Sequence, residues 1–350
     1  MKALKIGDKV AKVPIIQGGM GVGVSLGRLA GAVAKEGGVG IISTAQIGYR
    51  KPEFEKNQEQ CNEQAIEEEI ALAKELSGQQ GLVGVNVMVA LKHYRQHVRI
   101  AAKAGADVVI CGAGLPMDLP ELVAGTDTKI APIVSSARCA KLLLQKWKRS
   151  YQYVADFVVI EGPKAGGHLG FSKEEVLEGI SFEEEIKAII SFVKEFGKTE
   201  GKEIPVIVAG GIFTHEDILH AMDLGADGVQ MATRFVATHE CDASQAYKEA
   251  YIQAKEEDIK ITQSPVGMPG RAINNAFLQR VEKGETCVKK CYQCLAKCNP
   301  ANIPYCITQA LVEAVKGNVD QGLIFCGSNV GRIREIVSVH DLMQELVYGK

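Results

Sequence analysis

Short, continuously apolar runs recur along the chain, and each ends in polar or glycine-rich sequence. A strand that is apolar without alternation is buried on both faces, as a parallel strand covered by helices is. Eight such runs occur, at residues 13–20, 39–44, 82–89, 107–114, 129–136, 156–162, 204–212 and 227–235. The pattern therefore predicts eight parallel strands.

Helical signals lie between these runs. Ser181 and Thr214 are each followed three residues later by an acid, Glu184 and Asp217, which is typical of a capped helix start. The charged stretch within residues 45–80 predicts a long, solvated helix that crosses the outside of the fold.

The repeated order of strand, polar loop, helix and small glycine-alanine turn predicts an α/β fold, the TIM (β/α)8 barrel. A doubly wound open sheet is the alternative, but it usually has fewer strands and one dominant phosphate-binding turn. We expect residues 1–240 to form the barrel. Residues 241–350 are expected to form a helical, cysteine-rich C-terminal extension packed on the barrel.

The amino-acid composition limits which kinds of partner the protein can bind and in which compartment we expect it. The 350 residues are 46% apolar and 23% charged with a net charge of -2, which favours neither nucleic acid nor an anionic membrane as partner. The start of the chain lacks the pattern of a signal peptide, and no apolar stretch is long enough to span a bilayer. Ten cysteines without a secretion signal favour reduced thiols or metal ligands, so we expect a cytoplasmic protein.

The active site of a (β/α) barrel lies at the carboxyl ends of its strands. Here those ends are rich in glycine, amide and hydroxyl groups and poor in carboxylates. A hydrolase or aldolase would need paired carboxylates or a lysine at this edge. The observed residue types favour a large, flat cofactor held by hydrogen bonds.

The last two predicted strands indicate a phosphate site. Gly210 and Gly211 follow the seventh run, and the eighth contains Gln230, Met231 and Thr233. The loops at these two strand ends commonly bind phosphate through converging backbone N–H groups. The alternative, in which the two glycines only serve a tight turn, does not account for the residues of the eighth strand.

His168 stands in the stretch EGPKAGGHLG, directly after the sixth run, among Gly166, Gly167 and Gly170. A lone histidine is more often structural than catalytic. In a glycine-rich loop at a strand end, however, its ring can approach a cofactor closely, and its near-neutral pKa suits proton transfer or hydrogen bonding to a developing anion. We interpret His168 as the catalytic residue.

Six stretches together resemble the nitronate monooxygenase family, formerly called 2-nitropropane dioxygenases, which also includes FMN-dependent enoyl-acyl-carrier-protein (enoyl-ACP) reductases. They are PIIQGGMGVGVS, GVNVM, EGPKAGGHLG, VIVAGGI, GVQMATRF and GMPGRAI, and they run in order over about residues 10 to 275. The resemblance implies a TIM barrel that carries FMN.

The resemblance also implies roles for individual residues. Gly18, Gly19 and Met20 would lie against the flavin ring, and His168 matches the catalytic histidine of the family. The other cofactor-binding positions would be Asn86, Glu161, Gly166 and Gly167 near the ring and Gly210, Gly211, Gln230, Met231, Ala232 and Thr233 near the phosphate. Two positions depart from the family. Glu161 stands where the monooxygenases often have glutamine, and QMAT replaces the usual QMGT.

Two chemistries follow from this resemblance. A nitronate monooxygenase oxidises alkyl nitronates with dioxygen, whereas an enoyl-thioester reductase uses NAD(P)H and would meet an acyl carrier protein. A third hypothesis is a barrel that binds a phosphorylated ligand without redox turnover. We expect a small-molecule substrate, with a homodimer and an electron-transfer partner as further expectations.

Five cysteines cluster near the C-terminus. Cys291, Cys294, Cys298 and Cys306 have a spacing close to those that hold iron–sulfur clusters, and Cys287 is an alternate ligand. An iron–sulfur cluster, a zinc site and a set of buried reduced thiols all fit this pattern.

Overall fold

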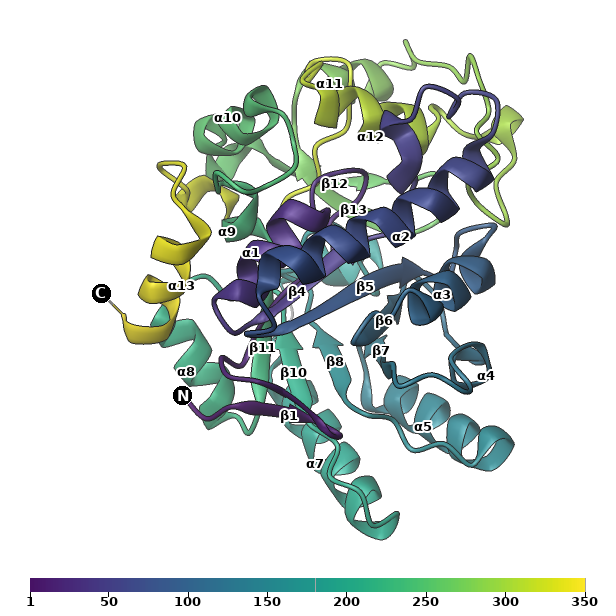
Figure 1. The fold of residues 1–350 in the computed structure, drawn as a ribbon. Helices are drawn as coiled ribbons and strands as arrows, with labels where there is room; N and C mark the ends of the chain where they lie inside the picture. The colour runs from purple at the N-terminus through teal and green to yellow at the C-terminus, as the bar shows by residue number, and fades with distance from the viewer. Residues whose placement is uncertain (180, 350) are drawn as a thin grey trace.

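A closed barrel of eight parallel strands forms the centre of the molecule (Figure 1). The computed structural model describes residues 1–179 and 181–349. The barrel strands are β3 (Ile15–Gln17), β4 (Val39–Ser43), β5 (Leu82–Met88), β6 (Val108–Gly112), β7 (Lys129–Val134), β8 (Val158–Glu161), β10 (Val206–Ala209) and β11 (Gly228–Met231). Each of the eight predicted runs contains one of them, and β11 pairs with β3 to close the ring. The predicted TIM barrel is confirmed, and the open sheet is wrong.

Burial on both faces explains the unbroken apolar runs. Ile16, Ile41, Ile110 and Val159 belong to a cluster that fills the barrel interior, while alternate residues of the same strands pack outward beneath the helices. A short antiparallel pair, β1 (Leu4–Ile6) and β2 (Lys9–Ala11), adds apolar side chains to the interior cluster.

Helices surround the barrel. They are α1 (Gly27–Lys35), α2 (Gln58–Ser77), α3 (Tyr94–Lys103), α4 (Leu119–Leu122), α5 (Ala137–Tyr151), α6 (Lys173–Glu178), α7 (Glu183–Thr199), α8 (His215–Asp223) and α9 (Thr233–Val236). Among the helices of the described chain, none is both long enough and apolar enough to cross a bilayer.

The predicted helix within residues 45–80 is α2, which begins only at Gln58. It is not simply solvated, because one face packs against α1 and buries Cys61, Ile66 and Ile70. A β-carbon on Gly31 of α1 would lie 2.7 Å from the β-carbon of Leu76. The absence of that atom lets the two helices approach closely.

One of the two predicted helix caps is wrong. Thr214 caps α8 as expected, accepting from the backbone N–H of Asp217 in a reciprocal capping box. Helix α7, in contrast, has Phe182 at its N-cap position and begins at Glu183, without a side-chain cap at Ser181. Phe182 packs edge-on against Phe171, and three successive glutamates in the first turn suit the helix dipole.

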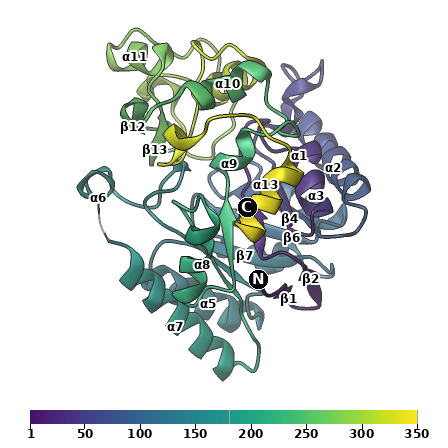
Figure 2. The same cartoon turned by 90° about the vertical axis from the view of Figure 1, so that its left-hand side faces the viewer.

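The chain beyond the eighth strand lies over the carboxyl ends of the barrel strands and along one side (Figure 2). It contains α10 (Gln245–Gln253), β12 (Ile259–Gln263), β13 (Pro269–Ile273), α11 (Ala276–Glu282), α12 (Ile307–Lys316) and α13 (Val339–Tyr348). Helix α13 packs against α1 and α8, beside the barrel. Strands β12 and β13 form a small antiparallel sheet with β9 (Gly167–His168), which joins this region to the loop after β8.

Substitutions at Thr214 and at Ser181 should have different effects on the free energy of unfolding. We expect Thr214→Ala to lower the free energy of unfolding by about 1 kcal/mol because a helix cap is lost. Thr214→Ser keeps the capping hydroxyl and is the matched control. Ser181→Ala should change little, since Ser181 caps no helix. Denaturant unfolding measures all three, and a loss for Ser181→Ala as large as that for Thr214→Ala would contradict this account.

Candidate active site

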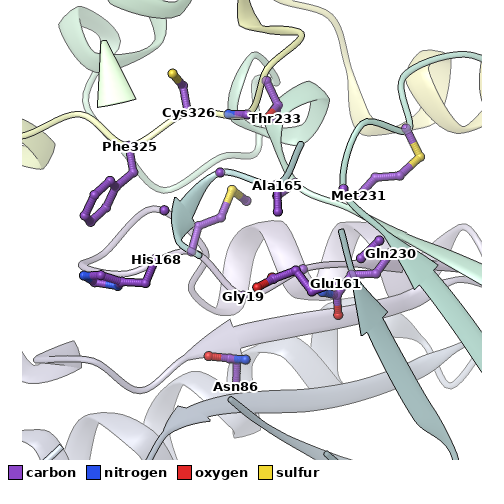
Figure 3. Close-up of a pocket in the computed structure, with 18 of the residues that line it drawn as sticks. Gly19, Asn86, Glu161, Ala165, His168, Gln230, Met231, Thr233, Phe325 and Cys326 are labelled. Carbon is purple, nitrogen blue, oxygen red and sulfur yellow. Dashed lines mark hydrogen bonds between the residues drawn. The ribbon is translucent and has the colours of Figure 1, made fainter. Parts of the chain in front are cut away.

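One pocket at the carboxyl ends of the barrel strands contains every residue predicted for catalysis or cofactor binding (Figure 3). His168 and Phe325 lie at one side of the view, and Glu161 and Gln230 lie at the other, with Asn86 below them. The predicted residues that line the pocket are Gly18, Gly19, Met20, Asn86, Glu161, Gly166, Gly167, His168, Gly210, Gly211, Gln230, Met231, Ala232 and Thr233. The ends of five predicted strands, one of which leads into the His168 loop, therefore meet at one place.

The glycines after β3 form a wall without side chains. The backbone N–H of Gly18 donates to the carbonyl of Met231, which ties this turn to the neighbouring strand end. A β-carbon on Gly19 would lie only 2.4 Å from the β-carbon of Asn86. Glycine is required here because the turn approaches Asn86 too closely for any side chain, and the face of the turn that lines the pocket is backbone.

The loop that carries His168 is held from outside the barrel. Gly167 and His168 pair with Arg271 and Gly270 of β13, and the Arg271 guanidinium donates to the carbonyl of Ala165. A β-carbon on Gly166 would lie 2.6 Å from the carbonyl carbon of Cys326. The glycines of this motif therefore allow two backbone segments to touch.

His168 is partly buried in the pocket. Its Nε2 atom lies 2.7 Å from the hydroxyl of Ser264, and its ring meets the Phe325 ring edge-on at 4.9 Å between centroids. Burial lowers the pKa of His168 to about 4, so the imidazole is uncharged near pH 7.

Glu161 is the last residue of β8 and shares the pocket with His168. Burial raises the pKa of this carboxyl to about 7. Its protonated form can donate a hydrogen bond, whereas an ionised carboxylate can accept hydrogen bonds but cannot donate any. The pocket thus combines a neutral histidine with a carboxyl that titrates near neutral pH.

The predicted phosphate residues meet a segment that the sequence did not identify. Gly210 and Gly211 have φ of 95° and 88°, a left-handed conformation that favours glycine. The Gly211 carbonyl accepts from the side-chain amide of Asn329 at 2.8 Å, and the Thr233 hydroxyl accepts from the backbone N–H of Gly327 at 3.1 Å. The ends of β10 and β11 therefore form one wall of a small cradle, and residues 325–329 form the other.

An unpaired hydroxyl in this cradle is available to bind an anion. The Ser328 side-chain oxygen is buried without a hydrogen-bond partner among the described residues, although the backbone N–H of Ser328 donates to the carbonyl of Lys164. A buried hydroxyl normally has a partner, and a phosphate oxygen would supply one. The residues present therefore fit the phosphate end of FMN.

Several lining residues escaped the sequence analysis. Tyr247 and Tyr251 come from α10, and Phe325 to Asn329 comprise the end of a short apolar run near the C-terminus and the turn after it. The one local signal was the small, polar stretch Gly327 to Asn329 directly after that run, which has the residue types of a ligand-binding turn.

The predicted metal ligands line a second cavity. Cys291, Cys294, Cys298 and Cys306 all border it, while Cys287 does not. All ten cysteines are free thiols. Across residues 1–179 and 181–349, no three His, Cys, Asp or Glu side chains are grouped so as to hold a metal ion. The metal site stays a prediction.

Backbone contacts fix the position of this cysteine segment. Leu295 forms an isolated antiparallel bridge with Leu91, and the carbonyl of Cys294 accepts from the backbone N–H of Lys92. The ring of Tyr292 stacks on Phe54. The segment is therefore attached to the loops that follow β4 and β5, apart from the His168 pocket.

Known proteins resemble this chain in sequence and in fold. A protein of Bacillus subtilis described as a probable nitronate monooxygenase is 25% identical, over 95% of this chain and 94% of its own. The solved structure of FabK from Thermotoga maritima is 26% identical with a TM-score of 0.71, covering 96% of this chain and 91% of that chain. A nitroalkane oxidase from Streptomyces ansochromogenes has the same fold, at 21% identity and a TM-score of 0.70, over 95% and 94% of the two chains.

The predicted resemblance is thereby confirmed at the level of the family. The family model described as nitronate monooxygenase matches residues 3–349, almost the whole sequence. The chain belongs to the nitronate monooxygenase family and is an oxidoreductase of that family.

Proposed function

We propose that the protein is an FMN-dependent oxidoreductase of the nitronate monooxygenase type, which oxidises alkyl nitronates with dioxygen. One observation carries the proposal. A single pocket joins an anion cradle that contains the unpaired Ser328 hydroxyl, a wall of glycines beside Asn86, and the neutral His168. The cradle suits a phosphate, the glycine wall suits a flat ring, and His168 suits a small substrate.

The residues of the pocket divide between the parts of FMN. The cradle of Gly211, Thr233 and Ser328 would hold the phosphate, and Gly18 to Met20 with Asn86 would face the ring. Bound FMN supplies a ring that takes up electrons from the substrate and passes them to dioxygen.

His168 would orient the substrate and stabilise its charge. A neutral imidazole can donate one hydrogen bond to a nitronate oxygen, and such a bond to a charged acceptor is stronger than a neutral one. Phe325, Met20 and Ile133 add apolar surface to the pocket lining. These groups displace water from the substrate and strengthen the electrostatic interactions around it.

Glu161 favours a second candidate function, the FMN-dependent enoyl-thioester reductase that uses NAD(P)H. This carboxyl stands where the monooxygenases often have glutamine, and burial places its pKa at about 7. Below that pH it is a hydrogen-bond donor and a source of protons inside the pocket. In this alternative, His168 would donate to the thioester carbonyl.

The cradle predicts how the cofactor is bound. Ser328→Ala should weaken FMN binding by roughly tenfold or more, since a hydrogen bond to a charged oxygen contributes about 1.5–3 kcal/mol. Quenching of flavin fluorescence during titration of the flavin-free protein measures the dissociation constant. Riboflavin, which has no phosphate, is the control ligand, and its affinity should not change. Equal losses for FMN and riboflavin would place Ser328 outside the phosphate site.

Anaerobic mixing separates the two candidate reactions. We expect an alkyl nitronate to bleach the flavin absorption band rapidly and NADH or NADPH to bleach it slowly or not at all. Rapid bleaching by a nicotinamide, followed by reoxidation with an enoyl thioester, would support the reductase instead.

His168→Ala should retain flavin and lose turnover. Unchanged turnover in that variant would remove His168 from the mechanism, and colourless protein would favour the non-catalytic barrel.

The cysteine segment carries a separate proposal, a soft-metal site formed by Cys291, Cys294, Cys298 and Cys306. Four thiolates can hold either a four-iron cluster or zinc. Anaerobically prepared protein should contain iron with acid-labile sulfide, or one zinc per chain. Cys294→Ser with Cys298→Ser should lose that metal and keep the flavin. Cys139→Ser, outside the segment, is the control, and metal-free wild-type protein would reject the site.

A further inference from the structure

A serine outside the barrel is the nearest polar partner of His168. Ser264 directly follows β12 and opens the tight turn that leads into β13, in which its backbone N–H donates to Met268 and its carbonyl accepts from Gly267. Only 3% of Ser264 is exposed. The hairpin thus presents a buried hydroxyl rather than a flexible surface group.

The strand register brings this turn to His168. Gly270 of β13 pairs with His168, and the backbone N–H of Leu169 donates to the carbonyl of Pro269. These contacts fix the histidine backbone against the same hairpin that carries Ser264. The distance of 2.7 Å between Nε2 and the serine oxygen therefore joins two groups whose backbones are both held in place.

The hydrogen-bonding capacity of the two groups assigns the proton. The Ser264 oxygen already accepts from the backbone N–H of Val266, and its own proton needs an acceptor. Nε2 of His168 is the acceptor within reach among the described residues. A neutral imidazole has one bare nitrogen and one N–H, so a bare Nε2 requires the proton on Nδ1.

We propose that Ser264 is a positioning residue that holds His168 in the Nδ1–H tautomer, so that the histidine serves the substrate as a neutral hydrogen-bond donor rather than as a base. This inference rests on the proposed function for its substrate, a nitronate or thioester oxygen. The geometry it uses belongs to the protein alone.

The assignment also fits the surroundings of the ring. The Phe325 ring packs edge-on against it, and the pocket adds Glu161 of β8 and Lys164 of the loop that joins β8 to β9. Arg271 of β13 is engaged with the carbonyl of Ala165. No carboxylate contacts either ring nitrogen of His168 in the described chain, whereas a carboxylate partner would favour the protonated form.

Nitrogen magnetic resonance of the FMN-loaded protein, selectively labelled with 15N-histidine, tests the tautomer directly. The chain has seven histidines, and loss of one signal in His168→Ala assigns the resonance. We expect Nε2 of His168 to resonate as a bare nitrogen and Nδ1 as a protonated one at pH 7. A protonated Nε2 in the wild-type protein would overturn the proposal. This readout needs no turnover, so it remains decisive if neither proposed reaction occurs.

Variants test the role of the serine. Ser264→Ala should remove the tautomer preference and lower kcat roughly five- to tenfold, the loss of one hydrogen bond of about 1 kcal/mol or slightly more, with little change in KM. Ser264→Thr keeps a hydroxyl and should restore both properties. Gln263→Ala, at the neighbouring exposed position, is the matched control. If the Ser264→Ala protein binds FMN and keeps the wild-type tautomer and kcat, the positioning role is refuted. If Ser264→Ala does not fold, the spectrum of the wild-type protein and the behaviour of Ser264→Thr test the proposal instead.

Discussion

The antiparallel pairing of Gly167 and His168 with β13 is the contact on which the site depends. The barrel places the loop after β8 at its rim, but nothing in a barrel strand determines where a glycine-rich loop points. Two backbone pairings with Gly270 and Arg271 and the bond from Arg271 to Ala165 fix that loop. A side chain on Gly166 would push the loop away from Cys326 and disturb this arrangement.

The pocket therefore has two origins. The barrel supplies the glycine wall, Asn86, Glu161 and the left-handed turn at Gly211, all at the carboxyl ends of parallel strands. The chain beyond residue 240 supplies Ser264, Phe325 and the second wall of the cradle. The barrel and the C-terminal region contact each other through backbone atoms as well as side chains. The C-terminal region is therefore an integral part of the site.

The sequence predicted what depends on local pattern. Continuous apolar runs identified all eight barrel strands because burial on both faces of a parallel sheet leaves that pattern in the residues themselves. The positions of the strand ends could then be predicted from the runs, and the residues at those ends are the ones predicted to line the pocket. Thr214 was recognised as a cap because its partner Asp217 is three residues away.

The misses involve contacts between distant parts of the chain. Ser181 has the local pattern of a cap, yet α7 begins at Glu183. There Phe182 packs against Phe171, and the Glu185 carboxylate accepts a hydrogen bond from the backbone N–H of Ala137. Ser264 lies 96 residues from His168, and Gly327 lies 94 from Thr233. Only the folded chain reveals such partners, because no local periodicity encodes them.

The identity of the bound cofactor is the central claim, and denaturing the purified protein tests it most directly. Mass spectrometry and chromatography of the released small molecule should find FMN at about one per chain, and flavin-free protein should take FMN back in the same ratio. Protein that contains no flavin and binds none on reconstitution would contradict the assignment of the pocket and every role derived from it.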